Sequence, residues 1–517
     1  MKTIACPPPH GIPGNLGLPF SAHAHSTHTA LIDLRHPHSP ISYQFCELDS
    51  AANAAARGLE RLGLRAGDRL GILSVNRAEY VITLLGAMRA GIIPVPINIK
   101  LPATTVQHIV RDSGASWVFA ESTYQSLLPP DIQTLHFDQA NAFTEFLDPG
   151  PYTATEPKPD TVAIQPYTSG STGKPKGVLL THYGQNWSRL ILAHTRGTTA
   201  DDVILVAAPL YHKNALNAIK QGLTAQATLI LMPQFNAEGY IAAIAKYRCT
   251  VISGVPTMIA MALARTAQLA DTDLSSVRTV MMGSAPSSMQ LLNDIRKYFI
   301  NAKPLVVYGV TEGGPVPLGP HPEGKERPLG SIGVPYAGTE AQLINGPNHN
   351  EGELILRNPG LLMGYHRLPA ETAKRLCNGW YHTGDICRRD DQGFYYFVGR
   401  TDDMFVCGGE NIFPIEVEQL IEQHPAVHQA CVIPFTHELK GQVPYAFIVL
   451  RTGQTTTSEE IKQFTLAHGP AYQHPRQVFF LEQLPLAGTN KIDREQLRTI
   501  ANNCCKKPDS PNLIRPI

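Results

Sequence analysis

The chain has 517 residues, of which 43% are hydrophobic and 17% are charged, and its 43 basic residues balance 43 acidic ones. A single hydrophobic core stops growing at roughly 250 to 300 residues, so at least two domains are expected. The composition excludes extensive disorder, and the neutral balance excludes a general attraction to nucleic acid or to an anionic membrane.

The N-terminus and the cysteines indicate a cytoplasmic protein. The first residues, MKTIACPPPHGIPG, place Pro and His where a signal peptide needs a continuous apolar stretch. Apolar runs such as VITLLGAMRAGIIPVPI are broken by Gly and Pro and are too short for a membrane span of roughly 20 residues. The nine cysteines form no CxxC pair and no metal-ligand spacing, which suits a reducing compartment.

Strands and helices alternate along the first 330 residues. Residues 50–67 read as an amphipathic helix ended by glycine, and residues 69–76 read as a buried strand. The same unit returns at 79–98, 113–120, 227–233, 249–268, 278–299 and 304–312. This alternation predicts an α/β class with parallel sheets covered by helices.

The pattern of predicted strands and helices changes twice after residue 330. Short strands and turns over residues 341–360 predict a small β-rich subdomain, and helices at 414–424 and 458–469 with strands at 426–435 and 444–451 predict an α+β module. We therefore predict a large N-terminal domain over residues 1–401 and a small C-terminal domain over residues 402–517.

The strongest motif is YTSGSTGKPKG at residues 167–177. Glycines let the backbone turn its amides toward an anion, hydroxyls add donors, and lysines add charge, so the loop predicts a site for a polyphosphate. The spacing of a Walker A loop is absent, which disfavours an ordinary P-loop kinase, and a Gly/Ser-rich surface linker is the structural alternative. The predicted phosphate-binding residues are Thr168, Ser169, Gly170, Ser171, Thr172, Gly173, Lys174 and Lys176.

From about residue 41 to 497 the chain resembles the adenylate-forming enzymes, which include acyl-CoA synthetases, firefly luciferase and nonribosomal peptide adenylation domains. The segment VYGVTEGG at 307–314 is similar to the family's adenine segment, which implies that Tyr308 flanks adenine, Thr311 contacts the α-phosphate and Glu312 holds magnesium. GWYHTGD at 379–385 and VGR at 398–400 imply that Asp385 binds the ribose hydroxyls and that Arg400 also reaches the nucleotide.

The C-terminal motifs of the family are also present. GRTDDMFVCGGENIFPIEVE at 399–418 implies a hinge at Asp402, about which the small domain moves, and places Gly408 and Gly409 near the pantetheine arm of coenzyme A. LPLAGTNKIDR at 484–494 implies that Lys491 bridges the substrate carboxylate and the α-phosphate. Asn490 replaces the usual glycine there, and asparagine tolerates the left-handed conformation.

The acid itself should bind near residues 209–222, PLYHKNALNAIKQG. His212 resembles a position beside the acyl carbonyl, although a buried core histidine is the alternative. We expect the side chains of Lys213 and Asn217 to face solvent. If either points inward, the acid should bear a second polar or anionic group. The remaining pocket wall is expected at small residues, which could instead be tight turns: Gly254, Gly283, Ser284 and Ala285.

These motifs together predict an enzyme that uses ATP and Mg²⁺ to convert a carboxylic acid to its acyl-adenylate with release of pyrophosphate, and then transfers the acyl group to coenzyme A. An acyl-AMP ligase or stand-alone adenylation enzyme that loads a carrier protein would share every nucleotide motif. A nucleotide-binding protein without catalysis is disfavoured, because Glu312, Asp385, Arg400 and Lys491 are all present. A homodimer is compatible with the sequence, which leaves the oligomeric state and the identity of the acid open.

Overall fold

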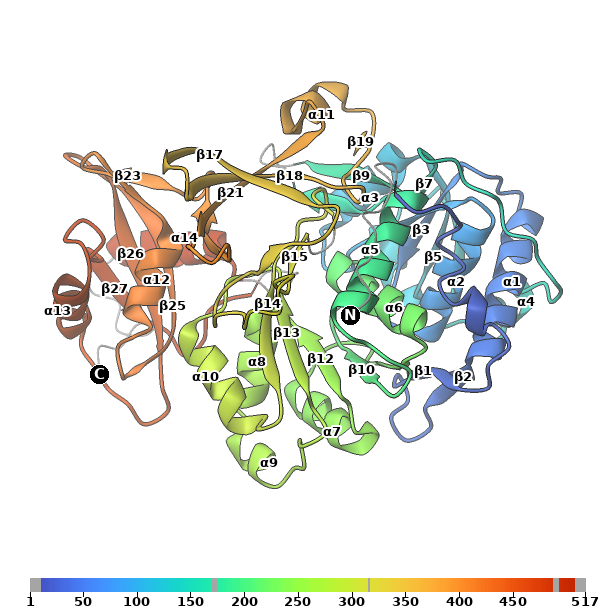
Figure 1. Ribbon diagram of the computed structural model, residues 1–517, viewed down its shortest axis with the longest axis horizontal. Coiled ribbons are helices and arrows are strands. Elements are labelled where there is room, and N and C mark those ends of the chain that lie inside the picture. The colour runs from blue at the N-terminus through green and yellow to red at the C-terminus, as the bar shows by residue number, and fades with distance from the viewer. Residues whose placement is uncertain (1–10, 170–173, 315–316, 487–491, 507–517) are drawn as a thin grey trace.

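The computed structural model describes residues 11–169, 174–314, 317–486 and 492–506. Its largest sheet has seven strands (Figure 1), in the order β14 (Lys303–Val307), β13 (Thr279–Gly283), β12 (Val251–Gly254), β10 (Val203–Val206), β11 (Thr228–Leu231), β1 (Thr29–Asp33) and β2 (Ile41–Gln44). All neighbouring pairs are parallel except β1 with β2. The predicted α/β class with parallel, helix-covered sheets is confirmed.

Alternate residues of this sheet enter two different hydrophobic clusters, as expected for a sheet buried on both faces. In β10, Ile204 and Val206 belong to one cluster, and Leu205 belongs to the other. The first cluster holds residues of α1 (Phe45–Arg61), α2 (Ala78–Arg89) and α6 (Lys213–Ala225). The second holds residues of α7 (Ala237–Tyr247), α8 (Pro256–Leu263), α9 (Thr266–Ala270) and α10 (Met289–Tyr298).

A second parallel sheet also packs against α1 and α2, because its Leu70, Ile72 and Phe119 join the first cluster; in Figure 1 it lies above β1 and β2. Its strands are β4 (Ile93–Pro96), β3 (Arg69–Leu73), β5 (Ala115–Ala120) and β6 (Gln133–His136), with α3 (Ala103–Ser113) packed on it. The helix predicted over residues 50–67 begins earlier, at Phe45, because Gln44 and Glu47 form a capping box, and it ends at Arg61.

Antiparallel strands connect these sheets to the C-terminal region. One group is β7 (Val162–Ile164), β8 (Tyr167–Ser169), β9 (Pro175–Thr181) and β19 (Gly364–Tyr365). The other, which we call the β17–β22 sheet, contains β17 (Glu340–Asn348), β18 (Glu351–Arg357), β20 (Leu376–Cys377), β21 (Trp380–Arg389) and β22 (Tyr395–Arg400). It occupies the region where short strands and turns were predicted.

The C-terminal unit, at the left of Figure 1, has its own sheet and hydrophobic clusters. It comprises β23 (Phe405–Cys407), β24 (Glu410–Ile412), α12 (Pro414–Ile421), β25 (Val427–His437), β26 (Gly441–Leu450), α13 (Ser458–His468), β27 (Gln477–Phe480) and α14 (Arg494–Lys506). The boundary predicted between residues 401 and 402 lies in the turn between β22 and β23, and the division into domains there stays a prediction.

The other elements are short, apart from α5 (His182–Thr195), which packs beside α6. They are η1 (Ser21–His23), η2 (Ser122–Leu127), α4 (Ala142–Phe146), β15 (Leu318–Gly319), β16 (Val334–Pro335) and α11 (Pro369–Arg375). None of the helices in the described ranges combines the length and the apolar character that a bilayer span requires.

Candidate active site

One cavity of about 890 Å³ lies between the seven-stranded sheet, the β17–β22 sheet and the C-terminal unit. We call it the main cavity. Residues far apart in sequence meet there because the carboxyl ends of β13 and β14, the start of α6 and the ends of β21 and β22 all open onto it. The predicted site residues that line it are Thr168, Lys176, His212, Lys213, Asn217, Gly283, Ser284, Ala285, Tyr308, Thr311, Glu312, Asp385, Arg400 and Asp402.

A buried carboxylate forms one end of the main cavity. The Tyr308 hydroxyl donates to Asp385 Oδ2 at 2.6 Å, and Arg400 Nη1 lies 3.1 Å from Asp385 Oδ1. Burial raises the pKa of the Asp385 carboxyl, and the charge of Arg400 opposes that shift. Arg400 therefore favours the ionised form of a carboxylate that burial alone would disfavour.

Local backbone geometry fixes the position of Asp385. The residue faces Arg400 across the antiparallel pair of β21 and β22, and its N–H donates to the Thr383 hydroxyl at 3.0 Å. The preceding Gly384 has φ of 70°, a conformation that favours glycine, and a Cβ there would lie 3.0 Å from Arg375 Nη1. The glycine of the GD pair is thus required by the backbone of β21, at the point where its register with β18 shifts.

Two hydroxyls hold the carboxylate of Glu312. Thr168 donates to Glu312 Oε1 at 2.9 Å and Tyr365 donates to the same oxygen at 3.3 Å. Thr168 comes from β8, at the start of the glycine-rich loop, so the loop and the VTEGG segment are joined directly. The side chain of Lys176 lies over the Tyr365 ring and forms an ion pair of 2.7 Å with Glu371.

The first turns of α6 form the opposite wall. Lys213 Nζ donates to the Thr311 carbonyl at 2.7 Å, and burial lowers the pKa of its ammonium to about 7 against the opposing charge of Glu312. Asn217 is 7% exposed and its Oδ1 accepts no hydrogen bond in the described part of the chain. The expectation that Lys213 and Asn217 face solvent is therefore wrong, because α5 and α6 pack with this polar stripe toward the main cavity.

Three small residues at the carboxyl end of β13 form part of the wall of the main cavity. Gly283, Ser284 and Ala285 line it, and Ser284 has φ of 67°, a strained value for a side chain other than glycine. Gly254 does not line it, which corrects that prediction: a Cβ at this position would face Met258 and Ile259 instead.

Several predicted residues lie elsewhere. Lys174 is exposed and does not line the main cavity. Gly408 and Gly409 form the turn between β23 and β24, with φ of 60° and 95°, and a Cβ added at either position would meet no atom within 4 Å. Ser169 ends β8 opposite Pro175. The remaining predicted residues, Gly170, Ser171, Thr172, Gly173 and Lys491, fall outside the described residues.

Among the lining residues that sequence patterns missed are Tyr365 and Arg196. Tyr365 lies in β19, and its adjoining glycine and aromatic pattern was the only available signal. Arg196 caps the C-terminus of α5 and carries no motif that distinguishes it from a surface arginine. Only the packing of α5 against α6 brings it to the main cavity.

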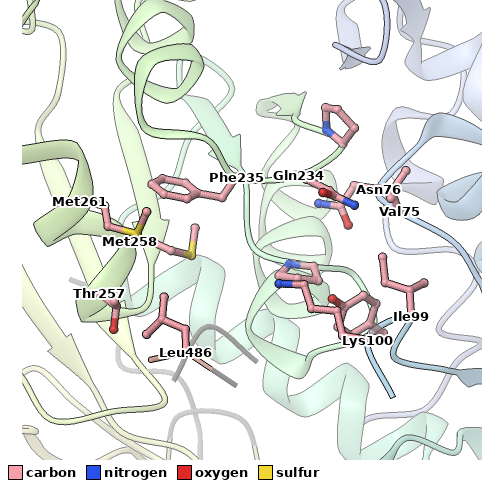
Figure 2. Close-up of a pocket in the computed structure, with 13 residues that line it drawn as sticks. Val75, Asn76, Ile99, Lys100, Gln234, Phe235, Thr257, Met258, Met261 and Leu486 are labelled. Atoms are coloured by element: carbon pink, nitrogen blue, oxygen red, sulfur yellow. The ribbon is translucent and has the colours of Figure 1, made fainter. Parts of the chain in front are cut away.

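A smaller pocket of about 120 Å³ adjoins the main cavity (Figure 2). We call it the side pocket. Asn76 and Lys100 lie on one side of it, and Phe235 and Met258 lie on the other. The side pocket shares Pro209, Thr257 and Met258 with the main cavity, and Leu486 of the C-terminal region also lines it.

Comparison with known proteins gives concordant results. Residues 19–366 match the model of the AMP-binding enzyme family, and residues 416–491 match the AMP-binding enzyme C-terminal domain. A 4-coumarate–CoA ligase of Vanilla planifolia is 32% identical over 489 residues, which cover 88% of this chain and 88% of that protein.

Two solved structures resemble the whole fold. The anthranilate CoA ligase AuaEII in complex with anthranoyl-AMP has a TM-score of 0.87 at 25% identity, with 96% of this chain and 98% of that chain covered. The o-succinylbenzoate coenzyme A synthetase MenE of Bacillus subtilis, in complex with ATP and magnesium ion, has a TM-score of 0.79 at 29% identity, with 94% and 99% covered.

Proposed function

This chain belongs to the AMP-binding enzyme family and is an AMP-forming acid–thiol ligase, and we propose that the main cavity is where it activates a carboxylic acid and transfers the acyl group to coenzyme A. The observation that carries this assignment of the site is the convergence of Thr168, Glu312 and the Tyr308–Asp385–Arg400 group on one cavity.

The reaction has two steps. A carboxylate oxygen attacks the α-phosphorus of ATP, the bond to the β-phosphate oxygen breaks, and pyrophosphate leaves with the bonding electrons. The thiolate of coenzyme A then attacks the acyl carbon and AMP leaves. Neither step needs a covalent bond to the protein, so positioning and stabilisation of negative charge supply the catalysis.

We assign the nucleoside to the end of the main cavity at Asp385. An ionised carboxylate can accept a hydrogen bond from each of two neighbouring hydroxyls, as a ribose diol presents them. The guanidinium of Arg400, 3.1 Å from Asp385, opposes the rise in pKa that burial causes and would add a donor for the nucleotide. The ring of Tyr308 would flank the adenine, and its hydroxyl orients Asp385.

Glu312 fits a magnesium ion. The hydrogen bonds from Thr168 and Tyr365 both reach Oε1, and magnesium binds through one or two carboxylates together with phosphate oxygens and water. When bound, magnesium would neutralise charge on the phosphates of ATP. Thr168 and Tyr365 hold the Glu312 carboxylate in one orientation, and the Lys213 ammonium holds the backbone of the adjoining Thr311. These contacts position the residues that we propose to face the α-phosphate.

The acid would enter along α6, with its carboxylate near His212 and its chain directed toward Asn217. His212 precedes the first residue of α6, where the unpaired N–H groups of the helix end favour an anion. Gly283, Ser284 and Ala285 form the facing wall.

We propose that the thiol of coenzyme A approaches through the side pocket, because Pro209, Thr257 and Met258 line both the side pocket and the main cavity. Gln234 is exposed and lines the side pocket but not the main cavity. Gln234→Trp should therefore obstruct the approach of coenzyme A. Adenylation should persist in this variant while thioester formation falls; equal losses in both steps would contradict the route.

The family resemblance adds a movement of the C-terminal unit between the two steps. Lys491 would complete the site for the first step, and rotation at Asp402 would bring the Gly408–Gly409 turn toward the thiol for the second. The homodimer and the cytoplasmic location also stay predictions from the sequence.

The test is pyrophosphate release with a panel of carboxylic acids, with and without coenzyme A, followed by mass detection of the product. We expect release that depends on ATP and acid, and a thioester only when coenzyme A is present. Release without thioester would favour an acyl-AMP ligase that loads a carrier protein. No release with any acid would contradict the proposed function.

A further inference from the structure

Helix α6 presents a polar stripe along the main cavity. Lys213, Asn217 and Gln221 follow one another at intervals of four residues, so their side chains share one face of the helix. The first two line the main cavity, and Gln221, which is buried, accepts a hydrogen bond from Arg196 Nη1 at 2.5 Å. At a rise of about 1.5 Å per residue the stripe is about 12 Å long, from the Thr311 carbonyl to the Arg196 guanidinium.

The end of this stripe carries an uncompensated charge. Arg196 lines the main cavity and its Nε has no hydrogen-bond partner among the described residues. Burial lowers the pKa of its guanidinium, and the neighbouring Tyr336 opposes that shift. Within the described ranges, no carboxylate forms an ion pair with Arg196, whereas Arg77, Arg89 and Arg278 each pair with at least one carboxylate.

A second cation lies beside the first. Arg327 donates to the carbonyl of Val306, a lining residue of β14, and to the carbonyl of Ser331. Burial lowers the pKa of Arg327 to about 10, Tyr336 opposes the shift, and the charge of Arg196 adds to it. No ion pair joins Arg327 to a carboxylate in the part of the chain that the structure describes. Two adjacent, partly buried guanidinium groups repel each other, and an anion bound between or beside them would relieve that repulsion.

The wall of the main cavity between Lys213 and Arg196 carries both apolar and polar side chains. Ala218, Met281 and Val307 line it with apolar atoms, and Asn217 interrupts them with a buried amide whose Oδ1 is unpartnered among the described residues. A buried amide oxygen without a partner at the wall of a cavity indicates that a polar group of the bound acid, or a water molecule, lies nearby.

We propose that the acid activated by this enzyme is a dicarboxylate, whose second carboxylate binds Arg196 at the far end of the main cavity, about 10 Å from the carboxyl that is adenylated. This inference rests on the proposed function, since it assumes that the first carboxylate lies near His212. A planar guanidinium binds a carboxylate through two parallel hydrogen bonds, which a hydroxyl cannot match.

Lys213 is the other cation on the stripe, and it is less suited to bind the second carboxylate. Its Nζ already donates to the Thr311 carbonyl, and the charge of Glu312 faces it. The side chain of Arg196 instead contacts Gln221 and Tyr336, and within the described residues it bonds neither a carboxylate nor a backbone carbonyl. The anion is therefore expected at the α5 end of the stripe.

The experiment compares acids matched in length. Pyrophosphate release is measured with saturating ATP, Mg²⁺ and coenzyme A for the dicarboxylates from adipate to dodecanedioate against the corresponding monocarboxylates, and for 4-carboxycinnamate against 4-coumarate. We expect kcat/KM for the best dicarboxylate to exceed that of its monocarboxylate by at least about tenfold. Equal or lower values for every dicarboxylate would overturn the inference and leave the proposed function in place.

Variants locate the effect. Arg196→Gln should lower kcat/KM for the preferred dicarboxylate by about 30-fold or more and change the monocarboxylate by less than about threefold. Arg196→Lys, which keeps the charge, should retain part of the preference. Arg189→Gln is the matched control, because Arg189 is, like Arg196, a partly buried arginine; it lies in α5, donates to Asn186 and Thr224, and does not line the main cavity. A ratio that is unchanged in Arg196→Gln, or lost equally in Arg189→Gln, would overturn the inference.

Direct binding separates this inference from the proposed function. Calorimetric titration with the same dicarboxylates needs no turnover, so it applies even if no acid releases pyrophosphate. Binding that is lost in Arg196→Gln and kept in Arg189→Gln, with melting temperatures close to that of the wild type, would support the dicarboxylate site. Equal binding by the wild type and Arg196→Gln, or none by either, would overturn it.

Discussion

The two ends of the main cavity satisfy their polar groups in different ways. At the nucleotide end, Asp385 has both Tyr308 and Arg400 as partners, and Glu312 receives two hydroxyls. At the acyl end, Asn217 keeps an unpartnered oxygen and Arg196 has no carboxylate partner among the described residues. Asp385 Oδ1 also lacks a hydrogen bond among the described residues, but it faces the opposite charge of Arg400, whereas the charge of Arg196 faces no carboxylate there.

This difference separates what the family shares from what distinguishes this chain. A nucleotide site that serves one cosubstrate can be prearranged, because every turnover presents the same groups. An acyl site sets specificity through polar groups that remain unpaired when the wrong acid binds, which is costly. The following predictions test each end.

The largest effect is expected at the nucleotide end. Glu312→Gln should lower kcat for pyrophosphate release by about 100-fold, because a neutral amide replaces the carboxylate that is proposed to hold magnesium. The dependence of the rate on Mg²⁺ concentration should move to higher values. Glu340→Gln, at an exposed ion pair with Arg357, is the control and should leave both quantities unchanged. An unaltered magnesium dependence in Glu312→Gln would remove this role.

The second prediction concerns Lys213, at the junction of the two ends. The pKa of its ammonium is about 7 in the folded protein, below its ordinary 10.5, so the unfolded chain binds the proton more tightly between these values. Stability therefore rises with pH across this window, and the cost of the buried charge is fully present below pH 7. Lys213→Met should exceed the wild type in free energy of unfolding at pH 6, on the order of 2 kcal/mol, with the advantage shrinking toward pH 10.

Denaturant unfolding of both proteins from pH 6 to 10 measures this difference. An advantage of Lys213→Met that stays constant with pH would show that Lys213 does not titrate in this range. Lys246→Met, at an exposed helical lysine that stacks on Tyr247, is the control and should show no such trend.

The third prediction separates the two half-reactions. Asp402 lies in the turn between β22 and β23, and proline there would restrict the backbone rotation that the hinge requires. Asp402→Pro should lower thioester formation by about tenfold while adenylate formation changes little, and Asp402→Ala should affect neither step strongly. Rapid-quench measurement of each half-reaction distinguishes the steps, and equal losses in both would argue against a hinge at this residue.

The smallest effect is expected at Asn217. Asn217→Leu replaces an unpaired buried amide with an apolar side chain of similar size, so the free energy of unfolding should rise by about 1 kcal/mol. Asn217→Asp should lower it, because a buried charge would be added. Thermal melting at pH 7 compares the three proteins, and a loss of stability in Asn217→Leu would indicate that the amide is paired.

Much of the fold follows from local sequence pattern. The runs at residues 69–76, 227–233 and 278–286 alternate with helices, and β3, β11 and β13 lie within them. The edges of the sheets were less predictable: β1 pairs with β11 across a separation of about 200 residues, with Leu31 opposite Leu229. Periodicity shows that a strand is buried but does not show which strand lies beside it.

The sequence by itself predicted the chemistry that we propose for the nucleotide end, because Thr168, Glu312, Asp385 and Arg400 lie in contiguous motifs whose residue types suit phosphate, magnesium and ribose. Only the tertiary structure decided the acyl end. In the sequence, Lys213 and Asn217 look like surface residues of a polar helix, and no motif marks Arg196. The packing of α5 against α6 orients all three side chains toward the main cavity. The physical reason is that the conformation of a phosphate-binding loop depends on residues adjacent in sequence, whereas the orientation of a helix depends on packing against residues far away in sequence.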